Sequence, residues 1–317
     1  MDSPRLPRFQ RSSAVFPLDL TNRDVLILRL VHRHRFLRSS HLTALVGGSE
    51  QMLLRRLQLL FHHGYLERPR AQLLYYERTG SRPFVYGLSS KSGKLLKAQL
   101  GSSYRPYRWS EKNRAVGRMF LEHALLVSDV LVALELACRR SSCVRLSMDE
   151  DLPIPGKPRS TFRWSVTLAG HIKLGVIPDR VFALEITRED GSTDRAYFFL
   201  EADRGTMPVT RRNLSQTSFA RKLFAYEGTW SQNLHRRQFG FHRFRVLTVT
   251  QSPERVTSLV EAASRLQRGH GLFLFADQTV LAQPDILFAP VLQSGRGEPS
   301  SLLTHRSYGC NGEGNEH

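Results

Sequence analysis

The chain has 317 residues, of which 41% are hydrophobic, and a formal net charge of +18. This hydrophobic fraction excludes a disordered polycation, and the length is typical of about two domains. The three cysteines have a spacing that matches no metal-binding motif. No run of about 18 apolar residues occurs, and no apolar segment follows the basic N-terminus. We therefore expect a cytoplasmic protein with neither a membrane span nor a secretory signal.

The positive charge is concentrated near the N-terminus. Residues 1–110 contain 19 Lys and Arg against 6 Asp and Glu, whereas residues 111–317 contain 27 against 22. A polyanionic partner is expected, because basic side chains that neutralise phosphates release condensed counterions. The alternatives are charge that serves only solubility and a basic patch for a membrane surface. No basic amphipathic helix long enough for a membrane surface is evident, so we favour nucleic acid.

Three helices are predicted in the first 65 residues. The first begins at Thr21, which is spaced from Asp24 as in a short capping box. The second is short and is broken at Gly47. The third covers Glu50 to His63, carries an apolar stripe and is ended by Gly64.

The pattern then changes to the alternation of strands, at residues 65–68 and 84–88, with a polar loop at 77–83. Three helices followed by a hairpin is the order of a winged helix-turn-helix, which we expect at residues 18–100, before a linker at 101–112. The candidate DNA contacts lie on the outward face of the third helix and in the loop: Arg55, Arg56, Arg78 and Arg82. There are two alternatives. The winged helix can contact another protein, or its arginines can simply form a solvated face.

Residues 113–293 are expected to form an α/β domain. A long amphipathic helix at 113–138 precedes predicted strands near 143–148, 161–168, 179–186 and 195–202, and then a helix ending near Gly228, a strand at 244–250, a helix at 253–267 and a strand at 271–276. This order predicts an α/β sandwich with a mixed sheet. The Gly- and Ser-rich tail, residues 294–317, is expected to be disordered.

Acidic residues mark the ends of the predicted strands in this domain. Asp179 begins one strand, and Glu201 and Asp203 end the next. Being two apart, Glu201 and Asp203 project from one face of their strand. Burying a carboxylate at the end of a buried apolar strand costs free energy unless the carboxylate is paired with a cation or binds a metal. Converging carboxylates predict a site for Mg²⁺ or Mn²⁺ with Asp179, Glu201 and Asp203 as ligands.

Three more side chains are candidates for this site. Lys222 flanks the core face of the next helix, so its ammonium can reach the carboxylates and stabilise negative charge. Arg204 can bind a phosphate or neutralise Asp203. His123, next to Glu122 on the long helix, can complete the site or be a buried core histidine.

A purely structural interpretation of the same residues is also open. Asp179 can cap a turn, Lys222 can be a surface residue, and Glu201 can bridge to Arg204 or Arg221. Each motif is common and weak when taken alone. The combination, in this order of elements, favours a metal-dependent phosphodiester site.

Short segments spread over residues 18–268 carry a further signal: Leu20–Asp24, Arg55–Leu57, Gly64–Leu66, Glu122–Leu125 and Pro178–Asp179. The most specific segments are Glu-x-Asp-Arg-Gly-Thr at 201–206 and Lys-Leu-x-x-Tyr at 222–226. Together these segments resemble the replication-relaxation family, which is encoded on plasmids and integrative mobile elements. That family is similar to the MobC-type relaxases, which combine a winged helix with a domain like the PD-(D/E)xK nucleases.

The resemblance implies binding of double-stranded DNA at a plasmid or mobile-element origin, with replication or conjugation proteins as partners. It also implies DNA nicking or relaxation. Asp179 and Glu201 match the two acidic positions of the nuclease motif. Asp203 stands where a lysine is expected, and Lys222 is the candidate for a displaced lysine. Without such a lysine the domain would only bind DNA.

Three functions are therefore open at this point. The first is a Mg²⁺-dependent nickase or relaxase, with Lys222 and His123 as catalytic side chains beside the three acids. The second is a non-catalytic replication initiator or transcriptional regulator that carries a degenerate nuclease domain. The third is an adaptor that links DNA to a conjugation coupling protein.

Overall fold

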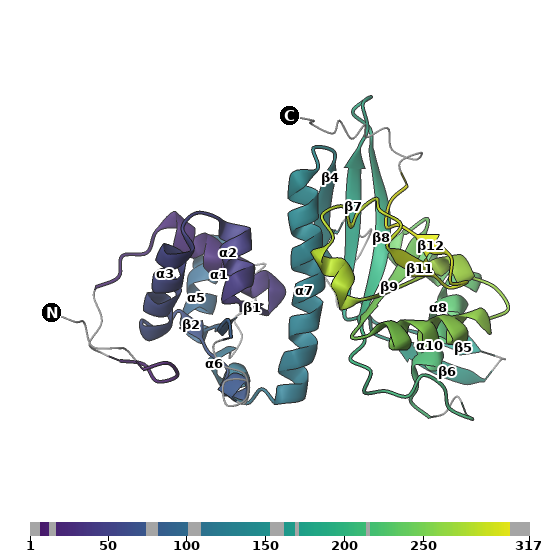
Figure 1. The fold of residues 1–317 in the computed structure, drawn as a ribbon, viewed down its shortest axis with the longest axis horizontal. Coiled ribbons are helices and arrows are strands. Elements are labelled where there is room, and N and C mark those ends of the chain that lie inside the picture. The colour runs from purple at the N-terminus through teal and green to yellow at the C-terminus, as the bar shows by residue number, and fades with distance from the viewer. Residues whose placement is uncertain are drawn as a thin grey trace. The chain divides into compact units, whose positions relative to one another are not determined.

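The computed structural model describes residues 7–12, 17–73, 82–100, 109–152, 162–168, 171–213 and 216–304. The chain divides into two compact units, Met1–Val132 and Ala133–His317, and the division falls within helix α7 (Arg118–Arg140). Both units combine helices with strands, which confirms the expected mixed α/β class (Figure 1). The prediction placed α7 wholly in the second domain. Residues 118–132 of this helix belong to the N-terminal unit, in which Leu121 and Leu125 pack against Phe36 and Val85.

Three helices open the N-terminal unit, as predicted: α1 (Asn22–His34), α2 (Ser39–Val46) and α3 (Glu50–His62). The capping box of α1 is present, because Thr21 N–H donates to Asp24 Oδ2 over 2.7 Å and Thr21 Oγ1 accepts from the Asp24 N–H. Ser49 caps α3. After α3, Gly64 has a φ of +77°, a left-handed conformation that costs glycine little.

A small antiparallel sheet completes this part of the unit, in the order β1-β3-β2: β1 (Phe36–Arg38), β2 (Leu66–Glu67) and β3 (Val85–Leu88). Strands β2 and β3 confirm the predicted pair. Strand β1 was not predicted, because three residues are too few for an alternating pattern to stand out. The buried Gln72, in the short helix η1 (Arg70–Gln72), fixes β3 by bonding to both the N–H and the C=O of Val85 (2.8 and 3.0 Å).

Two shorter helices precede α7: α5 (Ser90–Leu100) and α6 (Trp109–Arg114). Helix α6 begins inside the segment predicted to be a linker, and residues 101–108 lie outside the described part of the chain. The Arg35 guanidinium lies 4.4 Å from the Trp109 ring centroid, and the buried Asn113 donates to the Leu88 carbonyl over 2.7 Å. These contacts make α6 part of the folded N-terminal unit.

A seven-stranded sheet forms the C-terminal unit: β4 (Val144–Met148), β7 (Arg180–Thr187), β8 (Thr193–Ala202), β9 (Phe244–Thr250), β10 (Phe273–Asp277), β11 (Leu292–Ser294) and β12 (Pro299–Ser300). The strand order is β12-β11-β10-β9-β8-β7-β4. Strands β8, β9 and β10 are parallel, and the remaining pairs are antiparallel. The predicted mixed sheet is confirmed.

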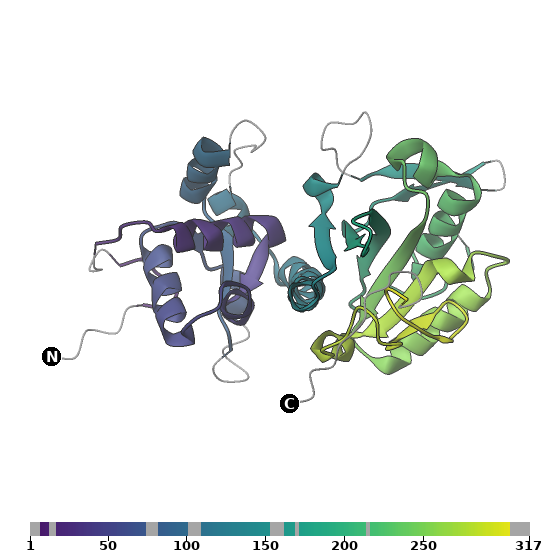
Figure 2. The same cartoon turned by 90° about the horizontal axis from the view of Figure 1, so that it is seen from above.

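The other elements of this unit are α8 (Phe219–Ser231), α9 (Leu234–Phe239), α10 (Pro253–Ser264) and a separate hairpin of β5 (Trp164–Leu168) and β6 (Ile172–Val176). Helices α8 and α10 cover one face of the large sheet (Figure 2). On this face Phe199 stacks on Tyr226. Trp164 ties the hairpin to α8 by donating to Thr229 Oγ1 over 2.8 Å. Among the described residues, no helix combines the length and apolarity that crossing a membrane requires.

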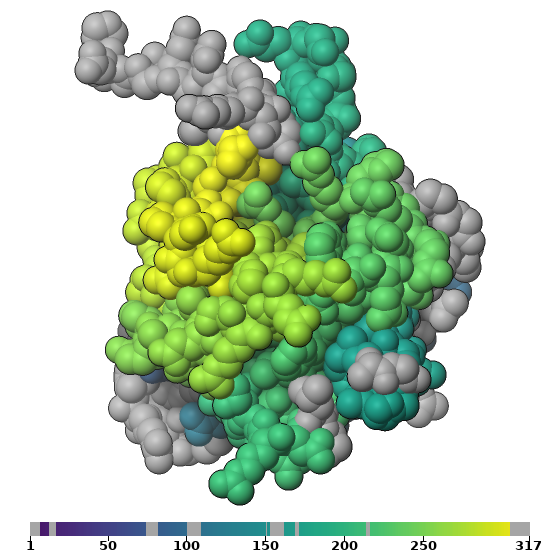
Figure 3. Space-filling model, turned by 90° about the vertical axis from the view of Figure 1, so that its right-hand side faces the viewer, coloured from purple at the N-terminus to yellow at the C-terminus, as the bar shows by residue number. Residues whose placement is uncertain are grey.

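The C-terminal segment differs from its prediction. Residues 294–304 were expected to be disordered, but Leu292 pairs with Ser300 across β11 and β12. Leu302 and Leu303 are also buried, and the Leu303 N–H donates to the Leu287 carbonyl over 2.8 Å. Figure 3 shows this segment in yellow on the surface of the C-terminal unit. Residues 305–317 lie outside the described part of the chain.

Candidate functional site

The strand register aligns the predicted acidic residues at one edge of the large sheet. Arg180 pairs with Leu200 across β7 and β8, and the Asp179 N–H donates to the Leu200 carbonyl, so Asp179 lies beside Glu201. On the other side of β8, Glu201 pairs with Thr248 of β9. Paired residues of neighbouring strands share a face. Asp179, Glu201 and Thr248 therefore form a row across three strands.

Glu201 is the buried centre of this row, with 1% of its surface exposed. Its Oε2 lies 2.5 Å from Lys222 Nζ, and its Oε1 accepts from the Tyr226 hydroxyl over 2.5 Å. Lys222 and Tyr226 are one turn apart on α8, so both side chains reach the same carboxylate. Ser218 caps the start of this helix. The structure thus brings Lys222 to the carboxylates, as its position beside the core face predicted.

Burial and neighbouring charges both shift the pKa values of this group of side chains. Burial raises the pKa of Glu201, against the effect of the Lys222 ammonium, and the nearby Asp179 raises it further. Burial opposes the charged form of Lys222, yet Glu201 and Asp179 outweigh this effect and raise its pKa. Burial and Glu201 raise the pKa of Tyr226 well above its ordinary value. Lys222 is therefore a cation and Tyr226 a neutral hydrogen-bond donor.

Asp179 is less buried than Glu201 and is fixed by the backbone. Its Oδ2 accepts from the Ala202 N–H over 2.8 Å, which couples the start of β7 to the end of β8. The contact with a backbone N–H agrees with the interpretation of Asp179 as a turn cap. It does not exclude the catalytic interpretation, because the electrostatic effect of Asp179 reaches both Glu201 and Lys222.

Asp203 belongs to a second, separate ion pair. Arg255 of α10 donates to both of its carboxylate oxygens (2.7 and 3.2 Å), and Thr250 donates to Oδ2 over 3.0 Å. Arg255 also donates to the Met207 carbonyl over 2.7 Å. The sequence did not suggest this arginine, which is 52 residues from its partner. Both carboxylate oxygens of Asp203 thus accept hydrogen bonds from Arg255. This ion pair argues against the predicted role of Asp203 as a metal ligand.

Without Asp203, the oxygen atoms at this site can supply only some of the ligands of a cation such as Mg²⁺. Among the described residues, no group of three or more His, Cys, Asp and Glu side chains is placed to hold a metal ion. Mg²⁺ often takes only one or two carboxylates and keeps its waters. Asp179 and Glu201 supply two carboxylates, and the adjacent Thr248 hydroxyl is buried without a hydrogen-bond partner among the described residues. Thr248 was also missed, although polar residues alternate at the end of its strand.

Three other predicted residues lie apart from this cluster or at its border. Arg204 follows β8 and is half-buried. Arg221 is half-buried on α8, next to Lys222, which forms the ion pair with Glu201. His123 lies on the part of α7 that belongs to the N-terminal unit, so its role at the carboxylates stays a prediction.

The two adjacent arginines of α3 have different environments. Arg55 is exposed. Arg56 instead donates to both oxygens of Asp24, over 2.7 and 2.5 Å, and to the Asp19 carbonyl over 2.5 Å. Asp24 is fully buried, and its pKa is lowered because Arg56 and the Thr21 hydrogen bonds outweigh the effect of burial. Arg56 is thus a stabilising residue, and Arg55 is the arginine of α3 that faces solvent.

The predicted loop arginines are only partly described. Arg82 is exposed just before β3, whereas Arg78 lies outside the described residues. Their contact with DNA stays a prediction.

The geometry defines a mixed α/β protein with a basic N-terminal unit and a buried carboxylate–lysine cluster at a sheet edge. The sequence model of the replication-relaxation family matches residues 28–243, more than half of the chain. The chain belongs to the replication-relaxation family, as its segments suggested. This membership indicates a role in the replication of mobile elements and an association with DNA. Neither a curated protein nor a solved structure shows significant similarity to the chain.

Proposed function

We propose that this protein binds DNA at the origin of a mobile element and nicks one strand with the cluster of Asp179, Glu201 and Lys222. The observation that carries the proposal is the contact of 2.5 Å between Lys222 Nζ and Glu201 Oε2, which joins α8 to the end of β8. A nuclease of the PD-(D/E)xK type needs two acids and a lysine at one place. Here the lysine would come from helix α8, while Asp203, just after β8, stands at the position of the motif where a lysine is usual.

The N-terminal unit is proposed to be a winged helix-turn-helix. Its order of α1, β1, α2, α3, β2 and β3 is the order of that motif, in which α3 would enter the major groove. Gln51 and Arg55 are exposed on α3 and are the side chains available for base or phosphate contacts. Arg82 is placed before β3, where a wing would meet the phosphate backbone.

The cluster has the chemistry that cleavage of a phosphodiester requires. Asp179 and Glu201 would hold a divalent cation, which when bound would supply charge stabilisation at the phosphoryl group. The Lys222 ammonium can stabilise negative charge that develops on the phosphate oxygens. Its side chain is 37% exposed, whereas that of Glu201 is only 2% exposed, so Lys222 is the member of the pair that a substrate can meet.

A supercoiled-plasmid assay tests this proposal. The wild type is expected to convert a plasmid that carries the cognate origin to the nicked form in Mg²⁺ or Mn²⁺. Glu201→Gln should lower the rate by about 100-fold or more, because an amide of similar shape cannot bind the cation as a carboxylate does. Glu189→Gln, at an exposed turn, is the matched control and should nick normally. Equal rates for Glu201→Gln and the wild type would exclude the site.

One observation favours a second function, which is origin binding without cleavage. Both oxygens of Glu201 already accept hydrogen bonds from the protein, and Asp203 is neutralised by Arg255. A replication initiator or regulator would keep such pairs only to stabilise its fold. This function predicts salt-sensitive binding to the origin with no strand breakage in either cation. Breakage that depends on Glu201 would exclude it.

A further inference from the structure

The C-terminal unit contains a pocket of about 850 Å³ that is separate from the carboxylate cluster. Its walls include Thr193 to Phe198 of β8 and the first residues of β9, with Leu302 and Leu303 on another side. Glu201 and Thr248 lie at the other ends of these two strands. The volume is within the range of small-ligand sites, which is roughly 300–1,000 Å³. The C-terminal segment that contributes Leu302 and Leu303 to the pocket is yellow in Figure 3, where it lies next to green segments of the same unit.

The pocket is strongly basic. Four arginines line it, Arg195, Arg236, Arg243 and Arg245, against a single acidic lining residue, Asp194. Asp194 is already paired with Arg188 over 3.1 Å, and Glu185 holds Arg195 over 2.8 Å.

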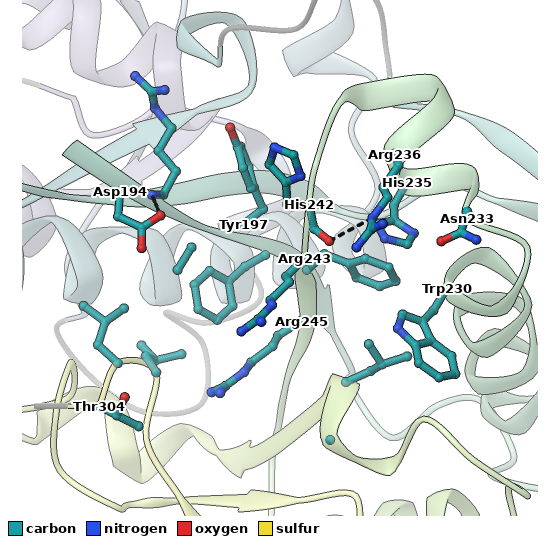
Figure 4. Close-up of a pocket in the computed structure, with 18 of the residues that line it drawn as sticks. Asp194, Tyr197, Trp230, Asn233, His235, Arg236, His242, Arg243, Arg245 and Thr304 are labelled. Carbon is teal, nitrogen blue, oxygen red and sulfur yellow. Dashed lines mark hydrogen bonds between the residues drawn. The ribbon is translucent and has the colours of Figure 1, made fainter. Parts of the chain in front are cut away.

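Two of these arginines carry positive charge that no described carboxylate neutralises. Arg236 donates only to the His242 carbonyl, over 3.4 Å, and Arg243 has no hydrogen bond or ion pair within the described part of the chain. Arg245 donates to the Ser301 carbonyl over 3.0 Å. In Figure 4 the Arg243 and Arg245 side chains extend side by side into the pocket. They are two residues apart, so their guanidinium groups can bind one phosphate group together.

Aromatic rings flank these guanidinium groups. Trp230 is 38% exposed and stands at one side of the pocket, and Tyr197 stands towards the other (Figure 4). Tyr197 is backed by Phe241, whose ring is stacked on it at 3.9 Å, so it has a fixed orientation. A rigid aromatic face beside arginines is the arrangement that binds an unpaired base next to its phosphate.

We propose that this pocket binds a nucleoside phosphate, either as a free nucleotide or as a unit of single-stranded DNA. Arg243 and Arg245 would bind the phosphate, and Trp230 would stack on the base. The inference goes beyond the proposed nicking function, because it uses neither Glu201 nor Lys222. Both sources present the same phosphate and base, and a titration can distinguish them.

The test is titration of the full chain with dATP and, separately, with a short oligothymidylate, in phosphate-free buffer, followed by tryptophan fluorescence. Either probe is expected to quench the signal of Trp230, and the change should be lost in Trp230→Phe. Arg243→Glu should weaken binding by about tenfold or more, since it replaces an attractive charge with a repulsive one. Arg265→Glu, an equal change of charge at an exposed position on the end of α10, should change it by less than about twofold.

The pattern of binding identifies the source. Quenching by dATP alone identifies a free-nucleotide site, and tighter binding of the oligothymidylate identifies a strand site. Both results support the proposal provided that Arg243→Glu weakens the binding. Quenching by neither probe, or equal binding by Arg243→Glu and the wild type, would overturn it. A nicking defect in Glu201→Gln has no bearing on this outcome, so the two proposals can fail independently.

Discussion

At the scale of single residues, two of the buried carboxylates that have a single basic partner give testable predictions. Glu201 is held by Lys222, and Asp24 by Arg56. Removing one partner of a buried pair leaves an uncompensated charge, whereas removing both costs much less. Comparing the stability of single and double variants therefore measures how much each ion pair contributes to the fold.

The Glu201–Lys222 pair should therefore respond unequally to single and double substitution. We expect Lys222→Met to lower the free energy of unfolding by about 2–3 kcal/mol, at the lower end of such losses because Lys222 is partly exposed. The double variant Glu201→Gln/Lys222→Met should recover most of that loss. Urea unfolding measures both values, with the exposed Lys173→Met as the control. A single variant as stable as the control would show that the pair contributes nothing.

The neighbouring arginines of α3 give a second prediction. Arg56→Ala should cost about 3 kcal/mol of stability, because it leaves the fully buried Asp24 without its bidentate partner. Arg55→Ala should change stability by less than about 0.5 kcal/mol, because Arg55 is exposed. Thermal or urea unfolding of the two variants provides the comparison. Similar losses in both would contradict the assignment of Arg56 as the stabilising residue.

These contacts also show what the sequence can and cannot predict about the site. Lys222 was predicted near the carboxylates, because the helical spacing of the apolar residues around it places it beside the core face of its helix. The Asp203–Arg255 pair was not predictable, because it depends on the register of β8 against β9 and on where α10 begins. The environment of Arg56 likewise depends on the packing of α3 against the start of α1.

At the scale of elements, α3 is the candidate recognition helix, and replacing its exposed arginine, Arg55, should change both the affinity for origin DNA and its dependence on salt. Arg55→Ala should weaken origin binding by about tenfold. It should also make the slope of log K against log salt less steep by about 0.9 if Arg55 contacts a phosphate. Lys97→Ala, an exposed change of the same charge on α5, should leave the affinity nearly unchanged. Equal effects of the two variants would mean that only net charge matters.

The start of α1 should make the N-terminal unit sensitive to acid. The folded-state pKa of Asp24 is lowered, so the folded chain binds this proton less readily than the unfolded chain. The stabilisation is thus fully present above about pH 5 and is lost as the pH falls through the unfolded and then the folded pKa. The difference in unfolding free energy between the wild type and Asp24→Asn should therefore shrink between about pH 5 and pH 2. A constant difference would contradict the assigned shift.

The longer elements were predictable and the shorter ones were not. α1, α3, α7 and α10 carry apolar residues at helical spacing over several turns, β8 carries an apolar run, and β9 is rich in apolar and β-branched residues. β1, β11 and β12 have two or three residues each, too few to show a period. Pairing with neighbouring strands, which no local pattern encodes, orders them. The composition of residues 294–304 was misleading for this reason.

At the scale of the whole molecule, charge and chemistry are divided along the chain. Residues 1–110 carry most of the excess positive charge, and the carboxylate cluster lies in the unit Ala133–His317. The proposed function assigns site selection to the first part and strand cleavage to the second. Binding and cleavage should then be separable by substitution, with Arg55→Ala reducing both and Glu201→Gln reducing only cleavage.

The most direct measurement is the nicked fraction of an origin plasmid at protein concentrations that saturate binding, with Mg²⁺ present. The wild type should accumulate nicked circles. Glu201→Gln, which should bind the origin as tightly, should accumulate about 100-fold fewer in the same time. Equal nicking by Glu201→Gln, or no nicking by the wild type while the origin is fully bound, would contradict the central claim. The second outcome would identify the protein as an origin-binding factor that does not cleave.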